Sequence, residues 1–131
     1  MDLCYCCSGV SLEQCCSPII KEDKAAETAE TLMRSRYSAY VLAAVDYLLK
    51  TTHRSTRKFY KASSIKDWAI SSKWLKLEII SKEEGTLSDN TGKVEFKAYY
   101  LDAKNIPRIH HEYSSFVKEN GRWFFVSGEV K

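Results

Sequence analysis

The spacing of apolar side chains changes about halfway along the chain. Between residues 28 and 50 the apolar positions recur every three or four residues, which is typical of one buried face of an α-helix. Thr28 can cap the start of this helix, which can also break near Ala43. The charged residues 21–26 are predicted to form a short linker before it, and a second helix is predicted around residues 65–70.

From about residue 75 the pattern alternates in the way expected of β-strands. Apolar and polar side chains alternate at residues 75–79 and again at residues 94–100, with turn residues between 85 and 92. A third strand is predicted at residues 109–117. The Asn120-Gly121 pair that follows is typical of a type I′ hairpin, with a return strand at residues 122–126. Helices followed by an antiparallel meander place the chain in the α+β class.

All five cysteines of this 131-residue chain lie within its first sixteen residues. Adjacent cysteines such as Cys15 and Cys16 rarely bridge each other without strain, and two crossed disulfides would leave Cys7 over. Four thiolates around one Zn²⁺ fit better, because zinc takes a tetrahedral sulfur shell at about 2.3 Å and the Ser8-Gly9 turn can fold the loop back. Such a shell leaves no open position for a water or a substrate, so the zinc is predicted to be structural.

Composition and charge narrow the range of partners. With 44% hydrophobic and 28% charged residues the chain has the composition of a globular domain, and it has no apolar run near the roughly 20 residues needed to span a bilayer. The formal net charge is +3, and four thiolates on a divalent ion would lower it by two, so nucleic acid and anionic lipid are not expected as partners. The first residues show no secretory signal, and we expect a cytoplasmic, reducing location.

The cysteine segment resembles a known zinc motif. The string C-x-C-x-S-G-x-x-x-x-x-C-C, at residues 4–16, is similar to the SEC-C motif at the C-terminus of the SecA translocation ATPase and to the N-terminal knuckle of the bacterial YchJ family. The resemblance implies a zinc knuckle at residues 1–20 whose ligands are Cys4, Cys6, Cys15 and Cys16. Cys7 stands where the family usually has glycine, so a spare thiol is available for ligand exchange or oxidation, and the loop at residues 10–14 lacks the usual lysines.

Two further segments resemble the same family. They are LMRSRYSAYVLAAVDYLLKTTH at residues 32–53 and HHEYSSFVKENGRWFFVSGEV at residues 110–130. The resemblance covers almost the whole chain and implies that residues 21–131 form a nuclear transport factor-2-like cone, in which helices pack in the concavity of a curved antiparallel sheet. Some relatives of that fold bind small molecules or catalyse reactions in the cone, and many do neither, so the fold alone gives no function.

Arg34 is the first candidate for chemistry in the cone. Steps of 100° per residue place it between Val41 and Val45 on the apolar face of the helix, whereas Arg36 falls off the edge of that face. A guanidinium on a buried face needs an acceptor. Arg34 is therefore interpreted as one member of a structural ion pair, with Glu112 or Asp46 as the partner, or alternatively as the anchor of an anionic ligand.

Two histidines and a glutamate are the remaining candidates. His53 lies at the expected end of the first helix, where it can meet exposed carbonyls or contribute to a ligand site. His110 and His111 must face opposite sides of a strand, so only one can point into the cone. His111 beside Glu112 is considered as a general base with its orienting carboxylate, the alternative being a polar strand pair. The abundant aromatic residues are expected to fill the cone as core.

No phosphate loop, nucleophile elbow or dinucleotide fingerprint occurs in the sequence, and nothing in it names a reaction. We therefore interpret the chain as a non-enzymatic, zinc-binding interaction module whose partner is another protein. The alternative is a cone that binds a small molecule or acts as an enzyme through Arg34, His53, His111 and Glu112. A third hypothesis is a thiol-redox role for Cys7.

Overall fold

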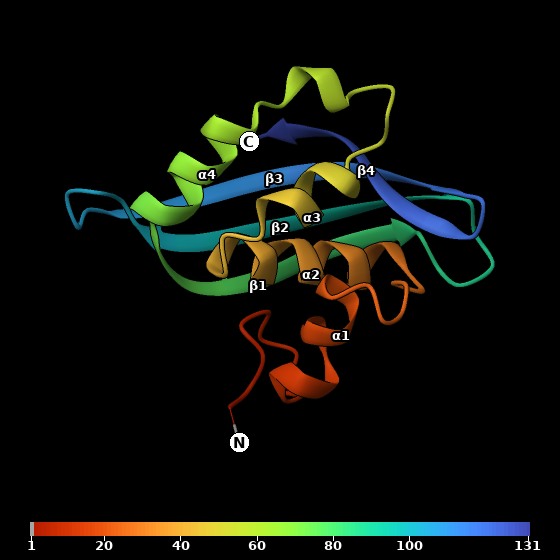
Figure 1. Ribbon diagram of the computed structural model, residues 1–131, viewed down its shortest axis with the longest axis horizontal. Helices are drawn as coiled ribbons and strands as arrows, with labels where there is room; N and C mark the ends of the chain where they lie inside the picture. Colours follow the sequence, from red (N-terminus) through yellow and green to blue (C-terminus); the bar gives the residue numbers. More distant parts are fainter. Residues whose placement is uncertain (1) are drawn as a thin grey trace.

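The computed structural model describes residues 2–131 and contains four helices and four strands among them (Figure 1). The helices are α1 (Cys16–Ile20), α2 (Ala29–Val41), α3 (Val45–Lys50) and α4 (Ala62–Ser71), with single 3₁₀ turns at Leu12–Gln14 and Arg57–Phe59. The strands are β1 (Lys73–Glu84), β2 (Thr91–Leu101), β3 (Pro107–Glu119) and β4 (Arg122–Val130). No helix in this part of the chain is long and apolar enough to cross a bilayer.

The four strands form one antiparallel sheet in the order β1-β2-β3-β4, which is the meander expected from the sequence. Its two faces follow the alternation of the sequence: on β2, Val94, Phe96 and Ala98 are buried beneath the helices and the residues between them are more exposed. Irregularities in the register within β1 and between Ser115 and Phe116 give the ladder its bends. Figure 1 shows the resulting curved sheet with α2, α3 and α4 across one face. The α+β prediction is confirmed.

The first long helical region divides into α2 and α3 at the expected place. Thr28 caps α2, because its Oγ1 accepts a hydrogen bond of 3.0 Å from the backbone N–H of Thr31. The helix ends at Val41, and Ala43, two residues later, has a φ of 54° in the left-handed region. The chain then restarts as α3 and afterwards runs beside β4, where Phe125 donates its N–H to the carbonyl of Thr51 and His53 donates to the carbonyl of Phe125.

The start of α2 is fixed against the β1–β2 hairpin by a close backbone approach. The N–H of Ala29 donates to the carbonyl of Gly85 over 3.0 Å, and a Cβ on Gly92 would lie only 2.5 Å from the Cα of Gly85. Gly85 also has a φ of +72°, which favours glycine. These two glycines let the hairpin and the helix meet, and they set the position of the helix that carries both arginines discussed below.

The core lies between the helices and the concave face of the sheet. Its fully buried side chains include Phe116, Leu32, Leu48 and Val94. Asn120 and Gly121 both have positive φ, as a type I′ hairpin requires, so that prediction is confirmed. β3 starts two residues earlier than predicted and β4 runs to Val130. Neither α1 nor the two 3₁₀ turns were predicted.

Candidate metal centre and cone cavity

The N-terminal residues fold into a short loop that returns to its starting point. The N–H of Cys4 donates to the carbonyl of Val10 over 2.8 Å, and Leu3 and Ser11 form an isolated antiparallel bridge. Gly9, with a φ of +86°, makes the turn between these two arms. The loop places Cys4 and Cys6 beside the start of α1, where the second pair of cysteines lies. Figure 1 shows the whole segment next to α2, and α1 contacts that helix directly.

The four cysteine sulfurs of these two pairs form one compact cluster. The Sγ atoms of Cys4, Cys6, Cys15 and Cys16 all lie within 4.8 Å of one another, with 3.6 Å between Cys6 and Cys15 and 3.9 Å between Cys15 and Cys16. Four sulfurs at about 2.3 Å from a tetrahedral Zn²⁺ would be about 3.8 Å apart, which agrees with this spacing. The cluster can hold a metal ion, and the donor set of four soft thiolates favours zinc. With four protein ligands the ion would have no open position for substrate chemistry.

Hydrogen bonding within the cluster favours the thiolate of one cysteine, Cys6. The hydrogen bond between the Cys16 and Cys6 thiols lowers the pKa of Cys6 and raises the pKa of Cys16, because the two sulfurs share one proton. Ser8 Oγ lies 3.2 Å from Cys15 Sγ and Ser38 Oγ, on α2, lies 3.5 Å from Cys4 Sγ. A bound Zn²⁺ would hold all four sulfurs as thiolates. The two serine hydroxyls can then donate to thiolate sulfur and orient it.

Arg34 links this cluster to the rest of the protein. Its Nη1 donates to the carbonyl of Cys6 over 2.6 Å, and its Nε donates to Glu30 over 2.8 Å. Glu30 also binds Lys82 of β1 over 2.6 Å. Burial would raise the pKa of Glu30, but the hydrogen bonds from Lys82 and Arg34 outweigh it and the net pKa is lowered. The cysteine loop, α2 and β1 are thus joined by one charged network.

The expected position of Arg34 in the cone is therefore wrong. Neither Glu112 nor Asp46 is its partner; the side chain points to the cysteine loop and does not line the cavity of the cone. The physical reason is that α2 is covered on two sides, by the cone and by the cysteine loop. Helical periodicity alone predicts a single buried face. Arg36, which that periodicity places off the edge of the buried face, is the arginine that enters the cone.

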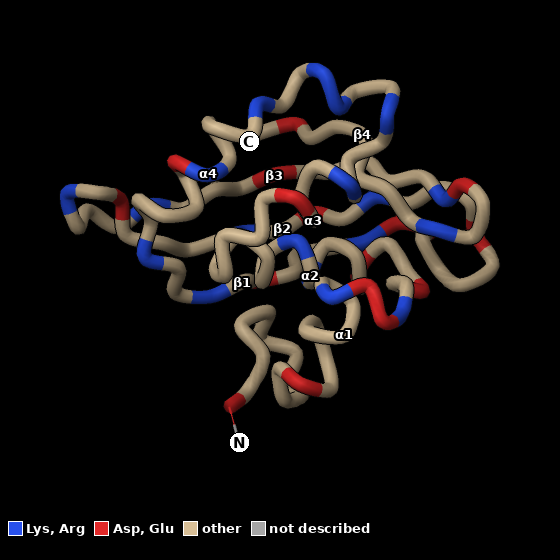
Figure 2. Tube along the Cα trace, in the orientation of Figure 1, with Lys and Arg blue, Asp and Glu red and all other residues tan. Residues whose placement is uncertain are grey.

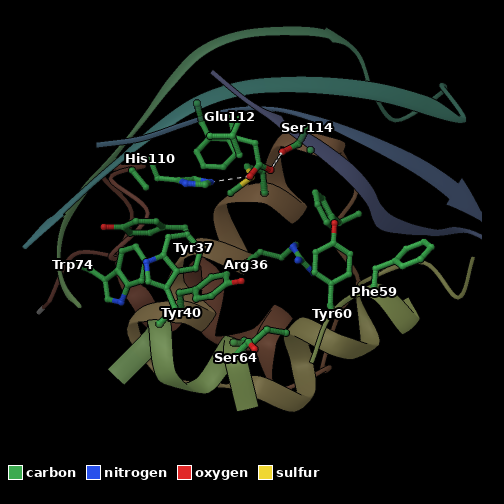
Figure 3. A pocket seen from close by; sticks show the side chains of 18 of the residues that line it. Arg36, Tyr37, Tyr40, Phe59, Tyr60, Ser64, Trp74, His110, Glu112 and Ser114 are labelled. Carbon is green, nitrogen blue, oxygen red and sulfur yellow. Dashed lines mark hydrogen bonds and ion pairs between the residues drawn. The ribbon is translucent and has the colours of Figure 1, made fainter. Parts of the chain in front are cut away.

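A cavity of about 600 Å³ lies between the helices and the concave face of the sheet (Figure 3). Much of its wall is aromatic, from Tyr37, Tyr40, Phe59, Tyr60, Trp68, Trp74, Phe96 and Phe125. The polar side chains in the wall include Arg36, Lys61, Ser64, His110, Glu112 and Ser114. The aromatic residues were expected to fill the cone. Several of them instead pack edge to face against one another around an open space, as Trp68 does with Trp74 and Tyr40.

The sheet side of the cavity carries a hydrogen-bonded chain of three residues on alternate positions of β3. His110 Nε2 lies 2.8 Å from Glu112 Oε1, and Ser114 Oγ donates to Glu112 Oε2. Burial would raise the pKa of Glu112, but the hydrogen bonds from His110 and Ser114 outweigh it, so the net pKa is lowered and the carboxylate is ionised near neutral pH. Gly128 on β4 leaves space for this group, since a Cβ there would contact the carboxylate.

Two of the other candidate residues lie outside the cavity. His111 points to the opposite face of the sheet, where its Nε2 is 2.6 Å from Glu95, so it cannot act with Glu112. His53 binds Glu119 over 3.0 Å and Ser55 over 2.8 Å. Glu112 is thus the one candidate of the four that lines the cavity. Strict alternation along the strand already pairs Glu112 with His110.

Arg36 occupies the helical side of the cavity, opposite His110 and Glu112 (Figure 3). Its Nη1 donates to the carbonyl of Leu48 over 2.9 Å and to Thr51 Oγ1 over 2.7 Å, close to the end of α3. The guanidinium carbon lies 4.6 Å from the centre of the Phe125 ring, a cation–π distance. The side chain is almost fully buried and burial lowers its pKa. Helical periodicity with a single buried face places Arg36 off the edge of that face, so it gives no sign of this position.

Helices held in the curve of a four-stranded antiparallel sheet, with a four-cysteine loop packed beside them, define a nuclear transport factor-2-like domain with an N-terminal knuckle. Residues 28–128 match the family model described as YchJ, middle NTF2-like domain. The chain belongs to the YchJ family.

Relatives over nearly the whole chain agree with this assignment. A UPF0225 protein of Geobacter sulfurreducens is 42% identical over 127 residues, covering 97% of this chain and 78% of the relative. A UPF0225 protein of Chromobacterium violaceum is 44% identical over 125 residues, covering 95% of this chain and 90% of the relative.

Two solved structures show the same arrangement. The solution structure of a SEC-C motif containing protein from Rhodopseudomonas palustris has a TM-score of 0.89 at 35% identity, with 98% of each chain covered. The crystal structure of a SEC-C motif containing protein from Psychrobacter arcticus has a TM-score of 0.81 at 31% identity, covering 98% of this chain and 82% of that one. The fold of the cone and its N-terminal segment is therefore shared with SEC-C motif proteins.

Proposed function

We propose that this chain is a zinc-binding interaction module. In this proposal residues 1–20 form a SEC-C-like knuckle around a structural Zn²⁺ bound by Cys4, Cys6, Cys15 and Cys16, and residues 21–131 form the rigid base that carries it. The observation that supports it is the cluster of four cysteine sulfurs within 4.8 Å of one another. We place the module in the cytoplasm, where thiols remain reduced and available to the metal.

The surface of the knuckle indicates the kind of partner. It exposes three large apolar side chains, with 65% of Leu3, 42% of Tyr5 and 43% of Val10 accessible. Residues 2–20 contain no lysine or arginine, and their charged side chains are Asp2 and Glu13 (Figure 2). Four thiolates on a divalent ion would add two further negative charges. A protein surface that presents apolar side chains next to lysine or arginine complements this combination, whereas nucleic acid and anionic lipid do not.

The test combines zinc analysis with affinity capture from a cell extract. Intact protein purified without chelator should contain one zinc per chain, and Cys15→Ser combined with Cys16→Ser should contain none. A second variant, Leu3→Ser with Tyr5→Ser and Val10→Ser, should keep its zinc because these side chains are not ligands. Ile109→Ser is the matched control, since Ile109 is 58% exposed but lies on β3 of the cone.

A true partner of the knuckle should bind the intact protein and the Ile109 variant but neither the cysteine variant nor the apolar surface variant. Its binding should weaken as the salt concentration rises, because the attraction between basic and acidic surfaces is screened. A protein that the apolar surface variant captures as well as the intact chain would contradict the proposed surface. Absence of zinc from gently purified intact protein would contradict the metal centre itself.

A further inference from the structure

The cone cavity has two chemically different walls. On the helical side, Tyr40 and Tyr60 lie near the guanidinium of Arg36, whose carbon is 4.6 Å from the centre of the Phe125 ring (Figure 3). On the sheet side, Glu112 is held by His110 and Ser114. The volume of about 600 Å³ lies within the range of roughly 300–1,000 Å³ that is usual for small-molecule sites. The cavity is thus large enough for a ligand, and its polar groups are concentrated at two places.

Arg36 has hydrogen-bonding capacity that the protein does not use. All of its hydrogen bonds to described residues come from Nη1, which is bonded to Leu48, Thr51 and Thr52. Within residues 2–131 neither Nε nor Nη2 has an acceptor, although only 7% of the residue is exposed. A guanidinium carries five N–H donors. Neither Nε nor Nη2 is among the fully buried atoms that lack a partner, so both donors stay accessible from the cavity. The unused edge of Arg36 can therefore bind an acceptor within the cavity.

The carboxylate of the cavity wall already has its hydrogen-bond partners. Glu112 receives a hydrogen bond on each carboxylate oxygen, one from Ser114 and one shared with His110 Nε2, so its charge is compensated by the protein. It is the one carboxylate in the cavity wall among the described residues. The donors without a protein partner thus lie on the helical side, on Arg36. They can bind a hydrogen-bond acceptor and, because arginine is cationic, they favour an anionic one.

The aromatic rings of the wall indicate the shape of the apolar part of the anionic ligand. Tyr40, Trp68 and Trp74 meet one another at ring-centre distances between 5.1 and 5.7 Å and close one end of the cavity, while Phe59 and Tyr60 stand at the other end. Flat rings leave flat spaces between them, and an aromatic guest gains edge-to-face and stacking contacts there that an aliphatic chain lacks. We propose that the cavity binds a planar aromatic carboxylate, whose carboxylate accepts hydrogen bonds from Nε and Nη2 of Arg36 and whose rings lie against Trp68 and Trp74.

Binding of 2-naphthoate to the zinc-loaded full chain, measured by calorimetry, tests this proposal. The comparison ligand is 2-naphthamide, which has the same rings and no charge. The carboxylate should bind at least about tenfold more tightly, because a hydrogen bond to a charged partner is worth more than one to a neutral partner. In NMR spectra the indole signals of Trp68 and Trp74 should shift on binding. The signal of Trp123, which donates to the carbonyl of Glu27 outside the cavity, should not.

Two variants separate the cavity from the arginine. Ser64 lies on α4 and lines the cavity. Ser64→Trp should obstruct the cavity and lower the affinity for both ligands by about tenfold or more, without changing Arg36. Ile109→Trp, which adds the same side chain to the outer face of the sheet, should leave both affinities unchanged. Arg36→Met should reduce the affinity for 2-naphthoate to that for 2-naphthamide.

Three results would overturn the proposal. They are equal affinity of the intact protein for the two ligands, unchanged binding by the Ser64 variant, and no detectable binding of 2-naphthoate at millimolar concentration. The first two remain decisive even if Arg36→Met fails to fold through the loss of its bonds to the end of α3. None of them depends on the metal centre or on the surface of the knuckle.

Discussion

The knuckle and the cone differ in the amount of regular structure and in the number of buried apolar side chains. Within residues 2–20 the regular structure is one 3₁₀ turn, one helix of five residues and one isolated bridge, and the buried side chains are mainly cysteines, with Ile19 beside them. The cone has twelve- and thirteen-residue strands and a core built around Phe116, Leu32 and Leu48. Because the segment buries few apolar side chains, a bound metal would add more to the stability of the knuckle than to that of the cone.

The difference also separates the two candidate sites. In the knuckle, four cysteine sulfurs that could hold a metal are buried, and apolar side chains such as Leu3 remain on the surface. In the cone, apolar side chains are buried but leave a cavity. Helix α2 is the wall between them: Arg34 and Arg36 are two residues apart, about 200° around the helix, and point to the knuckle and to the cavity respectively. One helix thus supplies a cation to each site.

Loss of the metal should have the largest effect, and it should affect the knuckle and not the cone. Cys6→Ser should abolish zinc binding and unfold residues 2–20, because zinc binding of the order of 10 kcal/mol is what folds such a segment. The cone should remain folded because most of the buried core, including Phe116 and Leu48, comes from residues 26–125, although Cys6 packs in the same core. Backbone amide NMR spectra would show the signals of residues 2–20 collapsing to the positions of an unstructured chain while those of β1–β4 stay dispersed.

The neighbouring residue provides the control for this experiment. Cys7 is exposed and its one hydrogen bond to a described residue is to the carbonyl of Tyr5, so Cys7→Ser should keep one zinc and a folded knuckle. Loss of zinc from the Cys7 variant would assign that thiol to the ligand shell. Unfolding of the whole chain by Cys6→Ser would show that the cone depends on the metal after all.

The contact between Arg34 and Cys6 should have an intermediate effect. Arg34→Met removes the donor that holds the carbonyl of Cys6 and a positive charge next to the four thiolates. Groups that orient metal ligands from outside typically contribute about tenfold or more to metal affinity, so zinc affinity in a competition assay with a chelator should fall by about that factor. Lys82→Met is the matched control: it removes the other cation bound to Glu30 without touching the knuckle. Equal losses in the two variants would contradict a specific role for Arg34.

The order of elements was predictable because it depends on local signals. Thr28 as a cap, the break at Ala43 and the Asn120-Gly121 turn each specify the backbone within a few residues, and the change from helical to alternating spacing separates the helices from the sheet. The four cysteines were predictable for a similar reason, since their proximity follows from one short loop.

The cavity was harder to predict because its side chains come from elements far apart in the sequence. A single helix has one apolar stripe in the periodicity argument, so a helix covered on two sides, as α2 is, gives the wrong arginine. The prediction paired Glu112 with His111, whereas its partner is His110. Strand geometry alone would have given the right pair, because alternate residues of a strand share a face. Whether aromatic side chains fill a cone or surround a space depends on their packing in three dimensions, which no spacing along the chain reveals.

Removal of the charge of Glu112 should have the smallest effect of these changes, measured as the free energy of unfolding. The pKa of Glu112 is lowered from its ordinary value of 4.5, so its contribution to the free energy of unfolding is fully present above that pH and is lost as the pH falls through the lower, folded-state pKa. At neutral pH, Glu112→Gln should destabilise the protein by about 1 kcal/mol through loss of charge-assisted hydrogen bonds, and the difference from the unmodified chain should shrink in acid. Urea unfolding at a series of pH values measures this difference, and acid release of zinc, common to both proteins, cancels in it.

Glu95 on the outer face of the sheet is the matched control. It is paired with His111 much as Glu112 is paired with His110, and the hydrogen bond from His111 likewise lowers its pKa, but it lies in contact with solvent. Water screens such a pair, so Glu95→Gln should change the pH dependence of stability less than Glu112→Gln does. If the difference between Glu112→Gln and the unmodified chain stayed constant from neutral pH into acid, the carboxylate would not be ionised in the folded cone. The satisfied, negatively charged wall opposite Arg36 would then have to be described as a neutral one.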